Sequence, residues 1–431
     1  MPLAQGLRLT YCISDGATIV SHPIVEDAKI MRALPNLRHL RVFHLTMVHN
    51  SVNRAAQEAN LSQPAVTQAI ANLEDEFGCI LFERRSIGMF PTQSGQLLGV
   101  RVKRALDFIA EAGQRLGGST RQPASRVTFE RFVSTSQLRA LSAIAHTGNF
   151  AGAARYLRIT PPSVHRAATQ LEELAGVPLF ERVSQGLVLT RIGRALARSA
   201  NLAFHEIELA TQDIAAANGI IRGRVSIGSL PLAQANIVPN ALKLVLEKFP
   251  HASISVVDGS YEILLEALRN GEIDCLIGAL RSPAPAVDVE EEVLFEDQLA
   301  VLARSGHPLH GKSALSIADL ARAGWLVPRE GSPARELFDE LLADSGEAPP
   351  EEGLIETGSF TVIRAMLLNS DRLALLSVRQ ARDEIAEQKI APLPYAMKGL
   401  RRAIGVTTRR DYLPTELSSA MLEALRRFAV E

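Results

Sequence analysis

Apolar side chains recur at helical spacing in the front half of the chain, and they predict three short helices in succession. The first helix spans 37–49, the second spans 52–59, and the third lies between Ser62 and Gly78. Ser62 is placed to cap the third helix, and Pro64 lies in its first turn, where a missing N–H costs nothing. A β-hairpin, or wing, is predicted directly after the third helix.

The same pattern occurs a second time at an offset of 98 residues. Pro64 aligns with Pro162, and the run 81–84 aligns with 179–182. No gap is needed across roughly 60 positions, which chance does not supply. The chain therefore carries a duplicated three-helix module with a wing. Together with the helix that follows each, the two copies are placed at 37–120 and 121–220.

A long helical stretch follows each module, over 94–116 and over 191–217. Both stretches are rich in Ala, Leu, Arg and Glu, and the second has apolar residues near heptad spacing. A helix of this length with a narrow apolar stripe needs a partner. A homodimer through these linker helices is therefore expected, with a homotetramer as the larger alternative.

Helices and β-branched strands alternate from Arg222 onward, which predicts an α/β domain with a parallel sheet over 222–431. The chain crosses from a first lobe to a second lobe and then returns, so the domain is predicted to be a hinged clamp. The first lobe is placed at about 222–298 and 396–431, and the second at about 299–395. Residues 1–36 fit no pattern and are interpreted as an N-terminal extension, with disorder as one interpretation.

Charge is distributed unevenly between the two halves. Segment 37–117 has 9 basic and 7 acidic residues, and segment 121–217 has 11 basic and 7 acidic residues. The part from 222 onward has 23 basic and 30 acidic residues. A mildly basic front half beside an acidic back half indicates an anionic partner for the front, and double-stranded DNA is the candidate.

The polar face of the third helix in the first module suits hydrogen bonding to base edges, because Gln pairs with adenine and small or methyl-bearing side chains meet thymine. Arginines at the base of the wing, in the interval 84–92, are placed to bind phosphates beside the groove. The alternative is a three-helix interaction module whose polar face is simply solvated. The candidate DNA-binding residues are Arg54, Ser62, Gln63, Pro64, Ala65, Thr67, Gln68, Arg84 and Arg85.

The second module carries different side chains on the same face. His165 and Arg166 stand where the first module has Thr67 and Gln68, so its base preference should differ. Thr160 can cap this helix, and two prolines fit its first turn. Two interpretations of this helix stay open. One is DNA contact, which the outward-facing arginines favour, and the other is a packing and dimerisation surface. The candidate residues are Thr160, Pro161, Ser163, His165, Arg166 and Arg182.

The run AAQEANLSQPAVTQAIANLEDEFGCILFERRSIGMFPTQSGQLL resembles the winged helix-turn-helix of LysR-type transcriptional regulators. Their pattern is an Ala-Ala pair, Leu-Ser-Gln-Pro-Ala-Val-Ser, Leu-Glu, Gly, Leu-Phe-x-Arg and Thr-x-x-Gly. Thr67 stands where that family usually has serine, and Phe90-Pro91 replaces an aliphatic pair. Family members normally carry one module, so this chain resembles an unusual variant with a tandem module.

The resemblance implies a fold in which two winged helix-turn-helix modules with long linker helices precede a two-lobed effector domain similar to periplasmic solute-binding proteins. It also implies linker helices that pair two subunits, and it adds RNA polymerase as a candidate partner. The residues that inherit DNA-contacting roles by resemblance are Ser62, Gln63, Pro64, Ala65, Thr67, Gln68 and Arg84.

A ligand of a doubly wound sheet lies beyond the carboxyl ends of the strands, at helix N-termini that favour an anion. Four loops of the back half fit this description, and their hydroxyl and N–H groups suit a carboxylate or phosphate. The alternative for each single Ser or Thr is a helix cap. The candidate effector-binding residues are Ser229, Leu230, Arg281, Ser332, Arg335, Ser359, Phe360 and Thr361.

Motifs of catalysis are absent from the sequence. No GxSxG elbow, GxGxxG fingerprint, P-loop or HExxH occurs, so no catalytic residue, no bound metal, no cofactor and no enzymatic activity are predicted. Three scattered cysteines offer neither a disulfide framework nor a zinc ligand set, which fits a reducing cytoplasm. No apolar run approaches the roughly 18 residues of a membrane helix, and no secretory signal pattern is present, so neither insertion nor export is expected.

Together these features predict a cytoplasmic, sequence-specific DNA-binding transcriptional regulator, controlled by a small anionic metabolite bound between the lobes of its C-terminal domain. The alternative is a solute-binding or scaffold protein with vestigial helix-turn-helix modules and no DNA readout.

Overall fold

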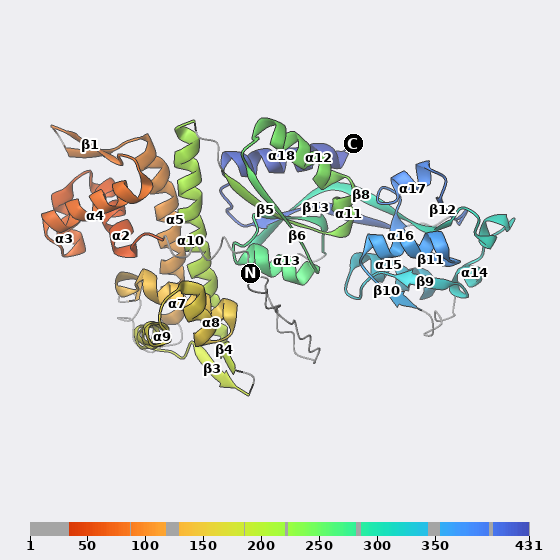
Figure 1. Ribbon diagram of the computed structural model, residues 1–431, viewed down its shortest axis with the longest axis horizontal. Coiled ribbons are helices and arrows are strands. Elements are labelled where there is room, and N and C mark those ends of the chain that lie inside the picture. Colours follow the sequence, from red (N-terminus) through yellow and green to blue (C-terminus); the bar gives the residue numbers. More distant parts are fainter. Residues whose placement is uncertain are drawn as a thin grey trace, which may run out of the picture.

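The computed structural model describes residues 34–86, 88–117, 129–184, 186–219, 223–281, 286–343, 354–395 and 400–430. A helical head lies at one end of an elongated molecule, and an α/β domain forms the rest (Figure 1). The predicted N-terminal extension lies outside the described residues except for its last three, 34–36. In the described part of the chain, no helix is long and apolar enough to cross a bilayer.

The first module consists of three helices and a wing, as the sequence predicted. Its elements are α2 (Leu37–His49), α3 (Val52–Ala59), α4 (Gln63–Phe77), β1 (Phe82–Arg85) and β2 (Gly88–Pro91). Ala55 and Ala56 are buried where α3 crosses its neighbours. Ser62 Oγ accepts a hydrogen bond from the Ala65 N–H, and Gly78, with φ 65°, ends α4. Both predicted ends of the third helix are therefore confirmed.

The second module repeats this arrangement. Its elements are α7 (Thr135–Thr147), α8 (Phe150–Leu157), α9 (Pro161–Ala175), β3 (Phe180–Val183) and β4 (Gly186–Leu189). Gly95 and Gly193 occupy equivalent positions after the two wings. A Cβ atom on Gly95 would lie 2.1 Å from the Leu81 carbonyl oxygen, and one on Gly193 would lie 2.2 Å from that of Leu179. The same close approach in both copies shows that the duplicated sequence forms a duplicated fold.

Two long helices connect the modules to the rest of the chain. They are α5 (Gln93–Gly117) and α10 (Arg191–Ala217), and they lie side by side (Figure 1). The start of α5 faces the end of α10, because Arg101 Nε lies 2.7 Å from Asp213 Oδ2 and Arg104 Nε lies 2.9 Å from Glu206 Oε1. The pair is therefore antiparallel.

The apolar stripes of α5 and α10 belong to one hydrophobic core. The prediction that each long helix needs a partner is confirmed. Within one chain each linker helix already covers the apolar stripe of the other, so a dimer through these helices stays a prediction.

The α/β domain is built on one mixed sheet of nine strands within the described residues. The strands are β5 (Arg224–Ser229), β6 (Ser253–Asp258), β7 (Cys275–Ala279), β8 (Val289–Arg304), β9 (Gly324–Val327), β10 (Ile355–Glu356), β11 (Arg372–Ser377), β12 (Ile390–Pro392) and β13 (Arg401–Arg409). The helices are α11 (Pro231–Ala235), α12 (Ile237–Lys248), α13 (Tyr261–Arg269), η1 (Pro308–Gly311), α14 (Ile317–Ala321), α15 (Pro333–Ala343), α16 (Phe360–Asn369), α17 (Arg382–Ala386) and α18 (Glu416–Val430).

The sheet order is β10-β9-β11-β8-β13-β7-β5-β6, with β12 also paired to β8. β5 is parallel to β6 and β7, and β9 is parallel to β10 and β11. The two longest strands, β8 and β13, are antiparallel to their neighbours, so the prediction of a parallel sheet is wrong there. The physical reason is that β13, which returns from the second lobe, enters the sheet between β7 and β8 and runs opposite to both.

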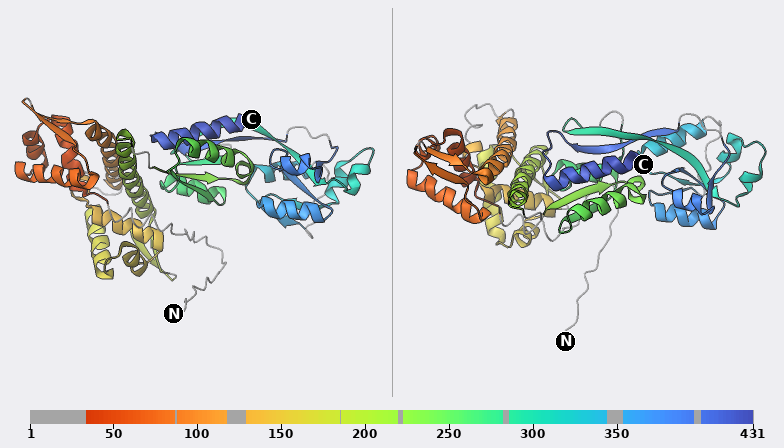
Figure 2. Two further views of the ribbon diagram at one scale, coloured as in Figure 1. Left: turned by 45° about the horizontal axis from the view of Figure 1, so that its top comes forward. Right: turned by 90° about the horizontal axis from the view of Figure 1, so that it is seen from above.

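β8 passes from one lobe to the other. Residues 289–298 of this strand pair with β13, and residues 299–302 pair with β11. Each lobe has its own core, since α12 and α18 pack on β5 and β7, whereas α14 and α15 pack on β9 and β11 around Trp325. Figure 2 shows β8 and β13 running between the lobes.

Candidate functional site

The outward face of α4 is polar and uncharged over its first two turns. Val66, Ala69, Ile70 and Leu73 point into the core of the module, so the intervening residues face away from it. Gln68 Nε2 donates to Asn72 Oδ1 at 2.9 Å, four residues further along the same face. This face therefore presents both donors and acceptors to a partner. Its exposed candidate residues are Ser62, Gln63, Pro64, Ala65, Thr67 and Gln68.

Both wing arginines of the first module are exposed. Arg84 forms no ion pair within the described part of the chain, so its guanidinium is available to a phosphate. Arg85 Nη2 lies 3.3 Å from Glu83 Oε2, and its guanidinium lies 5.2 Å from the centroid of the Phe90 ring. Arg54 is exposed on α3, where its backbone N–H donates to the Ser51 hydroxyl.

The candidate residues of the second module are also exposed, but one predicted contact is wrong. Thr160 does not cap α9, and its hydroxyl oxygen lies 2.8 Å from Ser163 Oγ. The Ser163 N–H, which would donate to such a cap, donates instead to the Thr160 carbonyl at 3.0 Å, and the Thr160 hydroxyl pairs with the Ser163 hydroxyl. The exposed candidates are Thr160, Pro161, Ser163, His165, Arg166 and Arg182.

Strand ends from both lobes meet where β8 and β13 cross between them. Asp297 of β8 accepts hydrogen bonds from Ser377 Oγ, at the end of β11, and from Arg402 Nε of β13, at 2.6 and 3.0 Å. On the other side of the crossing, the end of β7 pairs with β13 at Ile404, which is also paired with Phe295 of β8. The carboxyl ends of parallel strands in both lobes therefore face one region, where a ligand of such a domain is expected.

Arg281 is the predicted cation that the structure leaves available at this region. Its guanidinium lies 4.1 Å from the centroid of the Tyr261 ring, and Nη1 donates to the Ala279 carbonyl at 3.3 Å. Burial lowers the pKa of the Arg281 guanidinium, and the charges of Glu262 and of Glu336, which lies on the other lobe, oppose this shift. No described carboxylate lies within ion-pair distance of Arg281. A half-buried cation of this kind gains from an anionic ligand.

Arg335, by contrast, is already neutralised by carboxylates of its own lobe. Its Nε lies 2.9 Å from Asp339 Oδ1, and its Nη1 lies 3.2 Å from Glu356 Oε2. The hydrogen bond to Asp339 raises the pKa of Arg335. Ser332 Oγ donates to the Arg329 carbonyl at 2.6 Å and accepts from the Arg335 N–H at 3.2 Å. These contacts favour the helix-cap interpretation for Ser332.

The remaining candidates lie at the carboxyl end of β5 and at the start of α16. Ser229 is fully buried at the end of β5, and Leu230 is half-buried beside it. Ser359 accepts a hydrogen bond from the Val362 N–H and caps α16, whereas Thr361 is exposed and Phe360 is half-buried at the first turn of that helix.

Sequence reasoning missed the buried cluster at the crossing. Ser377 and Asp297 are 80 positions apart, and Arg402 and Asp297 are 105 positions apart. No spacing in the sequence joins such residues, because only the pairing of β8 with β11 and β13 brings them together.

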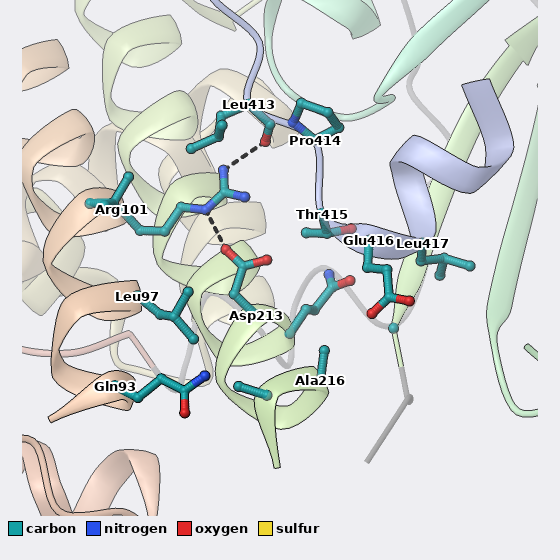
Figure 3. Close-up of a pocket in the computed structure, with 14 residues that line it drawn as sticks. Gln93, Leu97, Arg101, Asp213, Ala216, Leu413, Pro414, Thr415, Glu416 and Leu417 are labelled. Atoms are coloured by element: carbon teal, nitrogen blue, oxygen red, sulfur yellow. Dashed lines mark hydrogen bonds and ion pairs between the residues drawn. The ribbon is translucent and has the colours of Figure 1, made fainter. Parts of the chain in front are cut away.

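A pocket of about 430 Å³ lies at a different place, where α5 and α10 meet the segment before α18 (Figure 3). Arg101 is 1% exposed at its edge and donates from Nη1 to the Leu413 carbonyl at 2.8 Å (Figure 3). The helical head is therefore joined to the α/β domain by hydrogen bonds to the loop before α18. Further lining residues include Leu97, Ala216, Pro414 and Leu417.

Comparison with known proteins gives three matching regions. Residues 37–96 and 135–194 each match the bacterial regulatory helix-turn-helix protein domain of the lysR family, and residues 218–429 match the LysR substrate binding domain. The chain belongs to the LysR family of transcriptional regulators. In this family the small-molecule effector binds in the substrate-binding domain.

Two relatives of this LysR regulator differ in how much of it they cover. It is 34% identical to the HTH-type transcriptional regulator GalR of Pseudomonas putida over 398 residues, 92% of this chain and 98% of that relative. It is 27% identical to the HTH-type transcriptional regulator PcaQ of Agrobacterium fabrum over 279 residues, 65% of this chain and 89% of that relative. The first alignment includes residues of both modules. These relatives are named as regulators, so the function of this chain is regulatory and not enzymatic.

Solved structures show the same fold. ArgP from Mycobacterium tuberculosis matches with a TM-score of 0.54 and 18% identity, over 68% of this LysR regulator and 96% of that chain. LysG from Corynebacterium glutamicum, solved with bound effector Arg, matches with a TM-score of 0.50 and 19% identity, over 68% and 97%. The tandem module is thus an addition to an otherwise ordinary LysR fold.

Proposed function

We propose that this LysR regulator reads a specific DNA sequence with both α4 and α9, and that a small anionic effector bound between the lobes controls it. The observation that carries the DNA part is that each module presents an exposed polar helix face beside an exposed wing arginine, Arg84 in the first and Arg182 in the second. In each module, an arginine at this position binds a phosphate, and the helix beside it contacts base edges.

The second module also favours DNA contact over a packing surface. Arg166 and Arg182 are exposed and form no ion pair within the described residues. The apolar side chains of α7 and α9 are instead buried inside the module or against α10. A surface on which two exposed cations have no described ion-pair partner suits a phosphate backbone.

The anionic character of the effector is supported by two features that face the crossing from opposite lobes. Arg281 lies on the first lobe without a carboxylate partner. The first turn of α16 lies on the second lobe, where the backbone N–H groups of Phe360 and Thr361 have no partner within the helix. A carboxylate or phosphate between them would bind to a cation and to a helix N-terminus together.

The DNA proposal is tested with the full-length chain and duplexes from its own genomic neighbourhood. Fluorescence anisotropy would compare Gln63→Ala/Gln68→Ala, His165→Ala/Arg166→Ala and the control Gln114→Ala, an exposed residue of α5. Each recognition pair is expected to weaken binding about 5- to 150-fold, because one good base contact contributes about 1–3 kcal/mol. If the variant His165→Ala/Arg166→Ala bound DNA with wild-type affinity, the proposed role of α9 would be overturned. Absence of binding to every duplex at low ionic strength would overturn the whole DNA proposal.

The effector proposal is tested by thermal unfolding of the full-length chain with small organic carboxylates and with inorganic phosphate. A bound ligand at 100 times its Kd stabilises the folded state by about 2.7 kcal/mol. Arg281→Ala should abolish the stabilisation, whereas Arg335→Ala should largely keep it, since Arg335 is neutralised by Asp339 and Glu356. Equal effects of the two substitutions would contradict the assignment of Arg281.

A further inference from the structure

Equivalent residues of the two modules are in direct contact. The Leu37 N–H donates to Thr135 Oγ1 at 2.9 Å, and these residues are 98 positions apart, which is the offset of the repeat. Thr135 Oγ1 in turn donates to the Pro35 carbonyl at 3.0 Å. In a two-fold interface a residue meets its own counterpart only at the axis. The contact therefore marks a pseudo-two-fold axis inside a single chain.

The rest of the helical head obeys the same pseudo-symmetry. α5 and α10 are equivalent helices and pack antiparallel, as a two-fold axis perpendicular to them would place them. α2 packs on α5 and its counterpart α7 packs on α10. Leu40 and Phe43 of the first module share one buried core with Leu138 and Leu141 of the second. Figure 1 shows the result, with the first wing at the top of the head and the second at the bottom.

The reading surfaces do not share this symmetry. Gln68 and Arg166 are equivalent positions, and so are Thr67 and His165. Glutamine hydrogen-bonds adenine in the major groove, whereas arginine binds the O6 and N7 atoms of guanine. The backbone is therefore arranged as in a symmetric dimer, but the two recognition helices are expected to bind different bases.

We propose that one chain is a complete two-headed DNA reader, whose α4 and α9 enter successive major-groove segments of one duplex, and whose operator is two unlike half-sites. This inference rests on the proposed function that both helices contact DNA. Symmetric dimers of this class bind half-sites about 10–10.5 bp apart, and the palindromy of the site mirrors the symmetry of the protein. In this chain we expect the pseudo-two-fold packing to keep such a spacing and the unlike recognition helices to remove the palindromy.

Selection of binding sites from a random duplex library, using the purified full-length chain, tests the inference. The expected motif has an adenine contact in one half and a guanine contact in the other, roughly one helical turn apart. Arg166→Gln should change the preferred guanine to adenine in one half only, with a shift in preference on the order of 5- to 150-fold. Gln68→Arg should produce the reciprocal change in the other half. The double exchange Gln68→Arg/Arg166→Gln should reverse the polarity of the motif at these two positions.

Three outcomes separate the hypotheses. A palindromic motif, or a change in both halves on Arg166→Gln alone, would overturn the inference while leaving DNA binding intact. A library in which no sequence is enriched would overturn the proposed function itself.

Mixing of chains supplies a second test. Chains with Gln63→Ala/Gln68→Ala are co-expressed with chains carrying His165→Ala/Arg166→Ala, and binding to a duplex with one site is measured. No recovery is expected, because each head then keeps one damaged helix. Recovery of wild-type affinity would show that heads form between chains and would overturn the inference.

Discussion

In the Arg101→Met variant, the helical head is expected to unfold at a lower denaturant concentration than in the wild type. The Arg101 side chain is 1% exposed, its Nε lies 2.7 Å from Asp213 Oδ2, and its Nη1 lies 3.0 Å from Glu206 Oε2. The same Nη1 donates to the Leu413 carbonyl of the α/β domain at 2.8 Å. Methionine keeps most of the aliphatic volume, so the loss is mainly that of the charge and its hydrogen bonds.

Removal of one partner from a buried ion pair costs about 3–5 kcal/mol, because the other charge stays buried without compensation. Two features place Arg101→Met near the lower end of this range. Glu206 keeps Arg104, whose Nε lies 2.9 Å from Glu206 Oε1, and the Asp213 side chain is 18% exposed. The expected loss in the free energy of unfolding is therefore about 3 kcal/mol.

Urea unfolding of the full-length chain measures this loss, and Lys103→Met is the matched control. Lys103 lies two residues away on the same helix and pairs with Asp107, with side chains 62% and 52% exposed. An exposed pair at this spacing contributes about 0.3–0.5 kcal/mol. Circular dichroism follows the helices, whereas the single tryptophan, Trp325, reports on the second lobe by fluorescence. A difference below about 1 kcal/mol between the two variants would refute the reasoning that the Arg101 pair is buried and uncompensated on removal.

Three further predictions concern the wings, the linker turn and the junction of the domains. Arg84→Ala and Arg182→Ala should each lower the slope of log affinity against log salt by about 0.9, and an unchanged slope would exclude that phosphate contact. Gly95→Ala should destabilise the chain by about 1–3 kcal/mol, against no measurable change for the exposed neighbour Gln96→Ala, because the added Cβ meets a carbonyl oxygen at 2.1 Å. Burial lowers the pKa of His205, but the carboxylates of Asp274, 3.3 Å from Nε2, and Glu208, 3.9 Å from Nδ1, outweigh it and raise the folded-state pKa above 6.5. Stability from His205 is therefore present below pH 6.5 and lost as pH rises through the folded-state pKa. His205→Gln should therefore flatten the Tm profile above pH 6.5, and a profile as steep as that of the wild type would contradict this account.

The modules could be predicted from the sequence because the contacts that define them are local. Glu74 Oε1 accepts a hydrogen bond from the Leu81 N–H at 2.8 Å, and Glu172 Oε1 accepts one from the Leu179 N–H at the same distance. These pairs are seven residues apart and recur in both copies of the motif. Caps and turns act over a similar range, so composition and spacing carry enough information to place them.

The candidate effector site could be predicted only in part. The ends of β5 and α16 follow from the alternation of helices and strands, and the i,i+4 pair of Arg335 with Asp339 could have been recognised from spacing on one helix. The cluster of Asp297, Ser377 and Arg402 could not, because strand pairing between distant segments brings it together. Antiparallel pairing of β8 and β13 was missed for the same reason.

The sequence by itself determined that two like modules exist, that each is followed by a long amphipathic helix, and that the two reading faces differ at Gln68 and Arg166. The sequence did not determine which helix covers each apolar stripe, because a helix of the same chain and a helix of another chain can bury it equally well. Only the tertiary structure decided this, by placing α5 against α10 and Leu37 against Thr135. The burial is non-local and not directional, so its geometry depends on the packing of the whole head.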